Sequence, residues 1–358
     1  MPAQPNAPGN TRRRFCLAAA ALALEPTRAT AATADWTEGS AEQAGLRPGA
    51  LDGALLAGES LPALRALLVA RAGVLVAERY YGGAQVGDLQ PINSATKSVC
   101  SALVGLALHN GQLRSLDQTV AQLIPEAVTE VPGSPAAALT LRQVLSGRSG
   151  MAFDPMRYRE LVSAKPFVPY ALSRPALPVG APGWSYNDAL VALVAPILQR
   201  AQGADLAALA TRQLFQPLGI ERFGWQRDRD GHALAPAGLA LRPRDLLKFA
   251  ALMADGGRWQ GQQLLPAAWV QESLAPQGPA TWRAEPVEDV GYGLLWFTGR
   301  LHGQRVAWAW GYGGQFALLV PGLKLAVATA ATSPHPSALR EQTHAVMGLV
   351  SRVVEAAL

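Results

Sequence analysis

The chain has 358 residues, of which 49% are hydrophobic and 16% charged, a composition typical of a compact globular protein with a large core. Of the formal net charge of +5, the first 31 residues supply +3 from Arg12, Arg13, Arg14 and Arg28 against Glu25, which leaves +2 for the remainder. That remainder contains no basic run with interleaved aromatic residues, so composition and charge argue against nucleic acid as a partner.

The N-terminal residues have the pattern of an export signal. Residues 11–17, Thr-Arg-Arg-Arg-Phe-Cys-Leu, resemble the twin-arginine consensus and lead into an apolar run over 15–24. Small residues at 29–31 and 32–34 follow as candidate cleavage sites. Residues 1–34 are thus predicted to be a signal peptide read by the twin-arginine translocase, and the mature protein to be periplasmic or secreted; the alternative is a disordered basic tail.

No stable membrane anchor is expected. Ten apolar residues are too few to span a bilayer, and Cys16 stands at the front of the run and not at its end, where a lipoprotein cysteine would lie. The predicted mature chain keeps one cysteine, Cys100, and so forms no internal disulfide.

Strand patterns lie towards both ends of the chain, and helical patterns lie between them. A hairpin is predicted over 66–70 and 74–80, and further strands over 306–310, 315–320 and 325–329. Helices are predicted over 98–108, 141–145, 190–201, 206–214, 243–254 and 337–358. The expected fold class is α/β (α+β), with one antiparallel sheet built from both chain ends and flanked by helices.

The same patterns predict one domain over residues 35–358. Its sheet part covers about 35–110 and 286–358, and an inserted, mostly helical subdomain covers about 111–285. A cleft is expected where the two parts meet.

The most informative motif is Ser94-Ala-Thr-Lys97, because it places a lysine beside an otherwise apolar helix. The two side chains are three residues apart and share one helix face. The chain prefers arginine, with 27 Arg against four Lys. A buried lysine can lose its proton and activate a hydroxyl, whereas an arginine cannot. The motif therefore indicates an activated serine nucleophile, although a lysine that only reaches out to water gives the same pattern.

Two later segments fit that chemistry. Tyr186 lies between a Pro/Gly-rich loop and a predicted helix, and its phenolate, favoured by a nearby ammonium, is expected to take the Ser94 proton; alone it also fits a core aromatic. The glycine-dense bend at 310–316 could leave backbone N–H groups free to bind an oxyanion; alone it is a tight turn.

Histidine and metal chemistry find no support. The five histidines are scattered, no Gly-x-Ser-x-Gly elbow is present, and no His/Asp/Glu cluster has metal-ligand spacing. Neither a metal nor another cofactor is expected.

These residues together resemble the serine β-lactamase and penicillin-binding-protein superfamily, in its class C-like branch of esterases, D-aminopeptidases, D-alanyl-D-alanine carboxypeptidases and 6-aminohexanoate-dimer hydrolases. The likeness covers about residues 36–355. It is carried by Ser94-Ala-Thr-Lys97, Tyr186, and the stretches at 139–150, 242–246, 291–293 and 311–315. The resemblance implies Ser94 as the acylated nucleophile, Lys97 and Tyr186 as the proton-transfer pair, and the backbone N–H groups of Ser94 and Gln315 as the oxyanion hole.

Two positions depart from the family pattern. Where the family has Tyr-x-Asn, this chain has Asp188, which could hold Lys97 in its charged form, face a cationic substrate or cap a helix. Where the family has Lys/His-Thr-Gly, this chain has Tyr312, Gly313 and Gly314, so the cation that holds a substrate carboxylate is missing. Asp188, Tyr312, Gly313 and Gly314 are the expected substrate-binding residues.

The predicted function is an exported serine hydrolase that cleaves a small-molecule ester or amide through a Ser94 acyl-enzyme, similar to esterases and 6-aminohexanoate-dimer hydrolases. One alternative is a β-lactamase or D-alanyl-D-alanine carboxypeptidase, which the absence of a cation at Tyr312 disfavours. Another is a non-catalytic penicillin- or peptidoglycan-binding protein, which the intact Ser94, Lys97 and Tyr186 disfavour.

Overall fold

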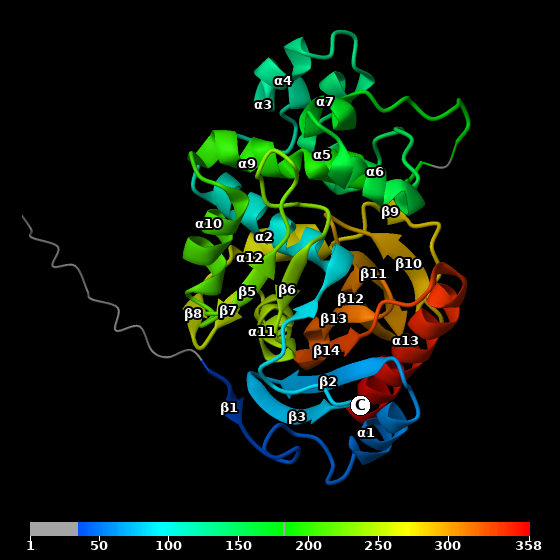
Figure 1. Ribbon diagram of the computed structural model, residues 1–358. Helices are drawn as coiled ribbons and strands as arrows, with labels where there is room; N and C mark the ends of the chain where they lie inside the picture. The colour runs from blue at the N-terminus through cyan, green and yellow to red at the C-terminus, as the bar shows by residue number, and fades with distance from the viewer. Residues whose placement is uncertain (1–34, 182) are drawn as a thin grey trace, which may run out of the picture. The chain divides into compact units, whose positions relative to one another are not determined.

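The computed structural model describes residues 35–181 and 183–358 (Figure 1). The predicted signal peptide lies outside these residues. Within them, a nine-stranded sheet forms the centre of the fold. Its strands, in spatial order, are β1 (Thr37–Glu38), β3 (Val74–Tyr80), β2 (Leu64–Arg71), β14 (Leu325–Ala331), β13 (Gln315–Val320), β12 (Gln304–Gly311), β11 (Phe297–Leu301), β10 (Glu288–Tyr292) and β9 (Gly278–Pro279).

The sheet joins the two ends of the described chain. All its neighbours are antiparallel except β1 and β3, and β2 pairs with β14 from Arg71 opposite Leu325 to Leu64 opposite Ala331. The antiparallel sheet built from both ends is therefore confirmed. One detail differs: β9 already joins the sheet before residue 286, because its backbone pairs with Tyr292 and Gly291 of β10.

Helices cover both faces of the sheet (Figure 1). On one face α11 (Pro243–Ala254) packs against β2, β13 and β14, and α2 (Thr96–His109) packs against β12. On the other face α1 (Asp52–Glu59) and α13 (Leu339–Ala356) pack together and against β2 and β14. The predicted helix at 337–358 is thus present, two residues shorter at each end.

The remaining helices form the part drawn at the top of Figure 1 and its links to the sheet. These helices are short. The helix predicted at 190–201 is two helices, because Pro196 has no N–H to donate to the carbonyl of Ala192, where the first one ends. The remaining helices are α3 (Val120–Leu123), α4 (Pro125–Thr129), α5 (Leu141–Leu145), α6 (Tyr158–Ser163), α7 (Phe167–Leu172), α8 (Asp188–Ala192), α9 (Val194–Gln202), α10 (Leu206–Ala210) and α12 (Ala267–Leu274). Smaller sheets pair β4 (Gln90–Pro91), β6 (Leu239–Leu241) and β5 (Phe223–Trp225), and β7 (Arg258–Trp259) with β8 (Gln262–Gln263).

Helix α2 is the buried helix that the sequence predicts. Every residue from Thr96 to Ala107 is buried. Its two buried serines are satisfied across the fold, because the Ser98 and Ser101 hydroxyls donate to the carbonyls of Leu295 and Leu294, each at 2.7 Å. Hydrophobic burial and these two bonds fix the helix that carries the motif.

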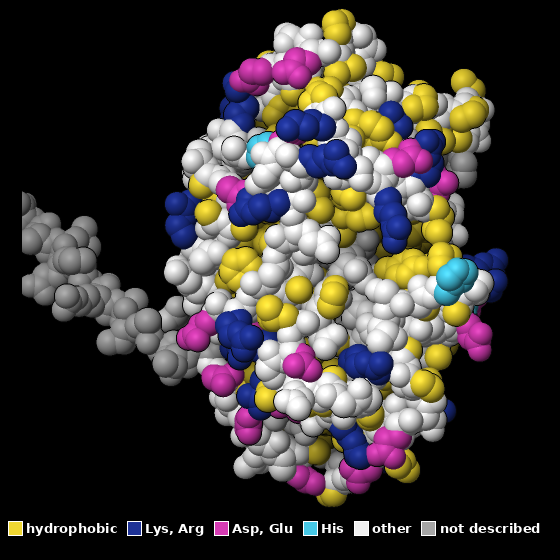
Figure 2. Space-filling view, viewed as in Figure 1, with side chains coloured by type: hydrophobic (Ala, Val, Ile, Leu, Met, Phe, Trp, Pro, Cys, Tyr) yellow, Lys and Arg dark blue, Asp and Glu magenta, His cyan; other side chains and the backbone are white. Residues whose placement is uncertain are grey.

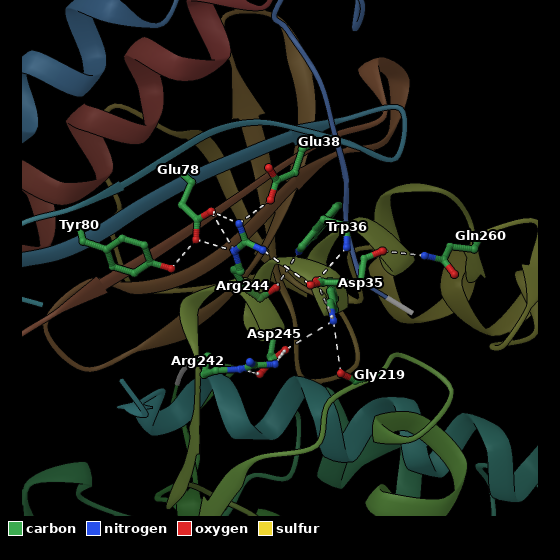
Figure 3. Close-up of polar contacts among 11 residues, drawn as sticks. Asp35, Trp36, Glu38, Glu78, Tyr80, Gly219, Arg242, Arg244, Asp245 and Gln260 are labelled. Atoms are coloured by element: carbon green, nitrogen blue, oxygen red, sulfur yellow. Dashed lines mark hydrogen bonds and ion pairs between the residues drawn. The ribbon is translucent and has the colours of Figure 1, made fainter. Parts of the chain in front are cut away.

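A cluster of charged side chains anchors the first described residues to α11 (Figure 3). The Arg244 guanidinium donates to the Glu78 carboxylate at 2.6–2.9 Å and to Glu38 at 2.7 Å. The Glu78 carboxylate also accepts a hydrogen bond from the Tyr80 hydroxyl at 2.5 Å. Burial and Glu78 together raise the pKa of that hydroxyl. The cluster connects residues more than 160 positions apart in sequence.

Among the described residues, no helix is long and apolar enough to cross a membrane.

Candidate active site

Ser94 stands on a short 3-10 turn, Asn93–Ala95, directly before α2. The Asn93 side-chain amide donates to the Tyr312 carbonyl at 3.0 Å, which ties this turn to the turn between β12 and β13. A Cβ atom on Gly311 would lie 2.2 Å from the Ile92 carbonyl oxygen, so only glycine permits this approach. Ser94 is partly exposed and therefore open to a substrate.

Lys97 meets three acceptors, one for each N–H of an ammonium group. Its Nζ lies 3.0 Å from Ser94 Oγ, 2.6 Å from an Asp188 carboxylate oxygen and 2.5 Å from the Pro236 carbonyl oxygen. The lysine is 2% exposed and the aspartate 4%, so this ion pair is out of water. A buried charge needs such partners, and the arrangement leaves no room for a lysine that only reaches out to solvent.

Asp188 thus takes one of its three expected roles. Its carboxylate pairs with Lys97 and is buried, so it does not face the substrate. The helix cap belongs to its neighbour, because the Asn187 side-chain oxygen accepts from the Leu190 N–H at 3.0 Å. The expectation of a substrate-binding Asp188 is therefore replaced by a role in holding the lysine.

Tyr186 adjoins both catalytic candidates. The Lys97 Nζ lies 4.7 Å from the centre of its ring. Burial raises the pKa of the Tyr186 hydroxyl well above its usual value, the Asp188 carboxylate raises it further, and a hydrogen bond with Ser94 acts in the opposite direction. Burial and Asp188 thus favour the neutral phenol over the phenolate that the sequence analysis expects. The phenolate base stays a prediction, which the titration of Tyr186 would test.

The Tyr312-Gly-Gly turn has a structural reason for each residue. The Tyr312 hydroxyl donates to the Pro334 carbonyl at 3.2 Å. Gly313 and Gly314 have φ angles of +86° and +97°, and added Cβ atoms would lie 2.7 Å from Pro334 and 2.9 Å from Val346. Close packing against the segment around α13, together with the left-handed backbone, requires both glycines.

Gln315 follows as the first residue of β13, and its side chain points into the sheet. Its amide oxygen accepts from the Ala331 N–H at 3.0 Å, and its amide nitrogen donates to the Ala331 carbonyl. The side chain is 2% exposed. Because these two hydrogen bonds hold the side chain, only the backbone N–H of Gln315 could serve the oxyanion hole expected there.

Three contacts of this site escaped the sequence analysis. The Pro236 carbonyl is a backbone group, which no side-chain motif reveals. Tyr158 of α6 has a buried hydroxyl without a hydrogen-bond partner among the described residues, and burial is the main reason that its pKa is raised. The Trp282 ring stacks on Tyr186 with ring centres 4.4 Å apart. None of the three has a recognisable spacing from Ser94.

In the described part of the chain, neither the cysteine nor a metal site offers a rival chemistry. Burial raises the pKa of the Cys100 thiol to about 12, so it is not a nucleophile near neutral pH. No group of three or more His, Cys, Asp or Glu side chains in residues 35–181 and 183–358 could hold a metal ion.

Comparison with known proteins identifies the family. The family model described as Beta-lactamase matches residues 54–351. The chain belongs to the β-lactamase family. The resemblance inferred from the motifs and the β-lactamase/transpeptidase-like fold are thereby confirmed.

Individual relatives agree with this assignment. The 6-aminohexanoate-dimer hydrolase of Paenarthrobacter ureafaciens is 26% identical over 227 residues, which are 59% of this chain and 57% of that protein. The chain thus spans a little over half the length of this curated relative. A β-lactamase-like protein from Bacteroides dorei DSM 17855 has a TM-score of 0.72 at 18% identity, over 87% of this chain and 99% of the other. A penicillin-binding-protein homologue from Caulobacter crescentus has a TM-score of 0.63 at 17% identity, over 83% and 97%.

Proposed function

We propose that this protein hydrolyses a small-molecule ester or amide through an acyl-enzyme formed on Ser94. The observation that carries the proposal is the 3.0 Å contact between Ser94 Oγ and Lys97 Nζ, with the lysine buried and held by Asp188 and Pro236. A serine hydroxyl beside a buried, desolvated lysine has the arrangement of an activated nucleophile. The similarity to a 6-aminohexanoate-dimer hydrolase supports a linear amide or ester as substrate.

In the proposed mechanism the reactive form of the site has Lys97 as a neutral amine, after loss of one proton from the ammonium to solvent. Ser94 Oγ attacks the carbonyl carbon, and its proton passes to the Lys97 amine, directly or through the Tyr186 hydroxyl. The N–H groups of Ser94 and Gln315 hold the oxyanion. The pair then returns the proton to the leaving alkoxide or amine, and water releases the acyl group from Ser94. Asp188 is a positioning residue, because it touches Lys97 and not the reacting carbonyl.

The substrate preference rests on Tyr312. A cationic side chain there would bind a substrate carboxylate by a charge-assisted bond, roughly twice as strong as a neutral one. Tyr312 is neutral, and its hydroxyl already donates to Pro334. Short uncharged esters are therefore expected to react faster than carboxylate-bearing β-lactams.

The test is a hydrolysis panel with p-nitrophenyl butyrate, a linear amide dimer, a D-amino-acid peptide and a chromogenic cephalosporin. Ser94→Ala is expected to abolish turnover and fluorophosphonate labelling, and the adduct of the unchanged protein should map to the Ser94 peptide. A label at Ser149 would refute the assignment of the nucleophile. Faster turnover of the cephalosporin would favour a β-lactamase, and a stoichiometric adduct without turnover would favour a penicillin-binding protein.

We also propose export by the twin-arginine translocase, on the strength of the motif at 11–17. Replacement of Arg12 and Arg13 by Lys should hold the precursor in the cytoplasm, because the arginine pair is the signal the translocase reads. Cell fractionation measures this, and an unchanged periplasmic yield of the double variant would refute the proposal.

A further inference from the structure

A partly exposed tryptophan, Trp282, stacks on Tyr186, and a second one, Trp310, packs against the first. The Trp282 ring lies almost parallel to the Tyr186 ring, with centres 4.4 Å apart and an angle of 27° between the planes. The Trp310 ring stands nearly perpendicular to Trp282, with centres 5.5 Å apart. All three side chains are only partly buried. They form one continuous aromatic surface, which we call the aromatic wall (Tyr186, Trp282 and Trp310).

The aromatic wall adjoins the nucleophile at two points. Tyr186 interacts with Ser94 through its hydroxyl and with the Lys97 ammonium through its ring. Trp310 directly precedes Gly311, which packs against the backbone of Ile92, two residues before Ser94. Figure 2 shows a hollow across the middle of the molecular face, between the helical part and the sheet, with hydrophobic side chains along it. The N-terminal end of α2 lies at the same level in Figure 1.

Buried aromatic residues hold the aromatic wall from behind. Phe297 lies 5.8 Å from Trp282, nearly parallel, and 4.8 Å from Trp310. Trp308, which is fully buried, stacks against Phe297 with ring centres 5.6 Å apart. Interlocked rings of this kind have few alternative rotamers, so the exposed faces of Trp282 and Trp310 are fixed before a ligand arrives. Such a surface loses little side-chain conformational entropy when a ligand binds.

The ionic groups that act on Tyr186 do not favour a charged ligand. They are Lys97 and Asp188, which are buried and paired with each other at 2.6 Å. The polar group of Tyr312 is engaged with Pro334. A flat, uncharged, apolar group therefore matches the surface best.

We infer that Trp282 and Trp310 form a subsite for an uncharged aromatic group of the substrate, attached to the carbonyl that Ser94 attacks. Trp282 is the specificity-determining residue, since its ring is partly exposed and is stacked on Tyr186. The inference rests on the proposed hydrolase function and narrows its substrate class to aryl-containing esters or amides.

The test measures kcat/KM for three uncharged esters by pH-stat titration: butyl butanoate, butyl phenylacetate and benzyl butanoate. The second carries the aryl group on the acyl side and the third on the alcohol side, so the two identify which side the subsite takes. At least one aryl ester is expected to exceed butyl butanoate by about 10-fold, the scale of one well-placed aromatic pair. Trp282→Ala should bring that ratio close to one, and Trp282→Phe should keep most of it.

Trp259→Phe is the matched control, because Trp259 packs against Trp36 and not against Tyr186. In this variant the ratio of kcat/KM for the preferred aryl ester to kcat/KM for butyl butanoate should equal the ratio in the unchanged protein. If butyl butanoate is hydrolysed but neither aryl ester is faster, or if Trp282→Ala and Trp282→Phe both keep the full ratio, the subsite is refuted while the hydrolase remains. If neither the unchanged protein nor the Trp259→Phe control hydrolyses any of the three esters or the linear amide, the proposed function itself fails.

Discussion

The Lys97 ammonium donates to Ser94 on its own turn and to the Pro236 carbonyl before β6, and it forms an ion pair with Asp188 at the start of α8. These contacts fix the nitrogen next to the serine. The same contacts require a tetrahedral ammonium group that can lose a proton. A planar guanidinium would not reach the same three oxygens and does not lose its proton.

Lys97→Arg is therefore expected to lower kcat by about 10²-fold or more, on the scale of general acid–base catalysis. Tyr186→Phe should lower it by a similar factor. Steady-state kinetics with p-nitrophenyl butyrate measure both changes. Lys165→Arg, at an exposed lysine, is the control and should keep the original rate. A nearly active Lys97→Arg protein would show that the lysine only supplies charge.

The raised pKa of Tyr186 has a spectroscopic consequence. Since burial and then Asp188 raise it, Tyr186 should remain a phenol up to pH 10 and beyond. Asp188→Asn removes a raising charge and should move its ionisation to lower pH, whereas Ser94→Ala removes the opposing hydrogen bond and should move it higher. Tyrosinate absorbance near 295 nm, taken as the difference from the same protein with Tyr186→Phe, measures each shift. A tyrosinate step of Tyr186 near neutral pH would contradict the neutral phenol.

At the scale of elements, α2 depends on a single glycine to accept its neighbour α12. A Cβ atom on Gly105 would lie 2.3 Å from the ring of Trp269, a buried side chain that cannot move aside. Gly348, in the middle of α13, offers the opposite case, since nothing lies within 4 Å of its added Cβ.

Gly105→Ala is expected to destabilise the fold by roughly 1–3 kcal/mol through overpacking. Gly348→Ala should instead stabilise it by about 0.5–1 kcal/mol, because alanine restricts the unfolded chain and favours the helix. Urea denaturation followed by circular dichroism gives both free energies of unfolding. Equal effects of the two substitutions would contradict the close packing of α2 on α12.

Sequence patterns predicted the elements whose interiors are uniformly apolar, among them α2, β13 and β14. They missed β10 and β11, where Gly291 and Gly299 interrupt the pattern. Gly299 is needed because its Cβ would lie 2.8 Å from the Glu288 carbonyl oxygen, so the packing that requires glycine also hides the strand. The Ser94–Lys97 pair was predictable because it lies within one helical turn, whereas Trp282 and Pro236 reach the site only through the folded sheet and loops.

For the whole molecule, the Arg244 cluster holds residues from the first and last thirds of the chain together (Figure 3). Arg244 and Glu78 are mostly buried, with side-chain exposures of 19% and 16%. The Arg79–Glu59 pair joins the residue after Glu78 on β3 to the end of α1, with both side chains 46% exposed. Burial, and not the number of charges, distinguishes the two pairs.

Arg244→Ala should therefore lower the free energy of unfolding by about 2 kcal/mol, since it leaves the Glu78 carboxylate without its cation. Arg79→Ala should cost less than about 1 kcal/mol, the range of surface pairs. Thermal and urea unfolding measure the loss of stability in the two variants. An Arg244→Ala loss no greater than that of Arg79→Ala would show that the cluster does not anchor the N-terminal segment.

The pairing of β2 with β14 also governs when this protein can fold during its synthesis. Leu64–Arg71 leaves the ribosome before its partner on one side, Leu325–Ala331, and all the residues between the two strands are made in the interval. Until β14 follows, β2 has an unpaired edge and an apolar face, and the Ser94 turn lacks the β12–β13 turn that holds it. The sheet and the site therefore cannot be completed before β14 is made, and in the meantime the open edge of β2 is exposed to aggregation.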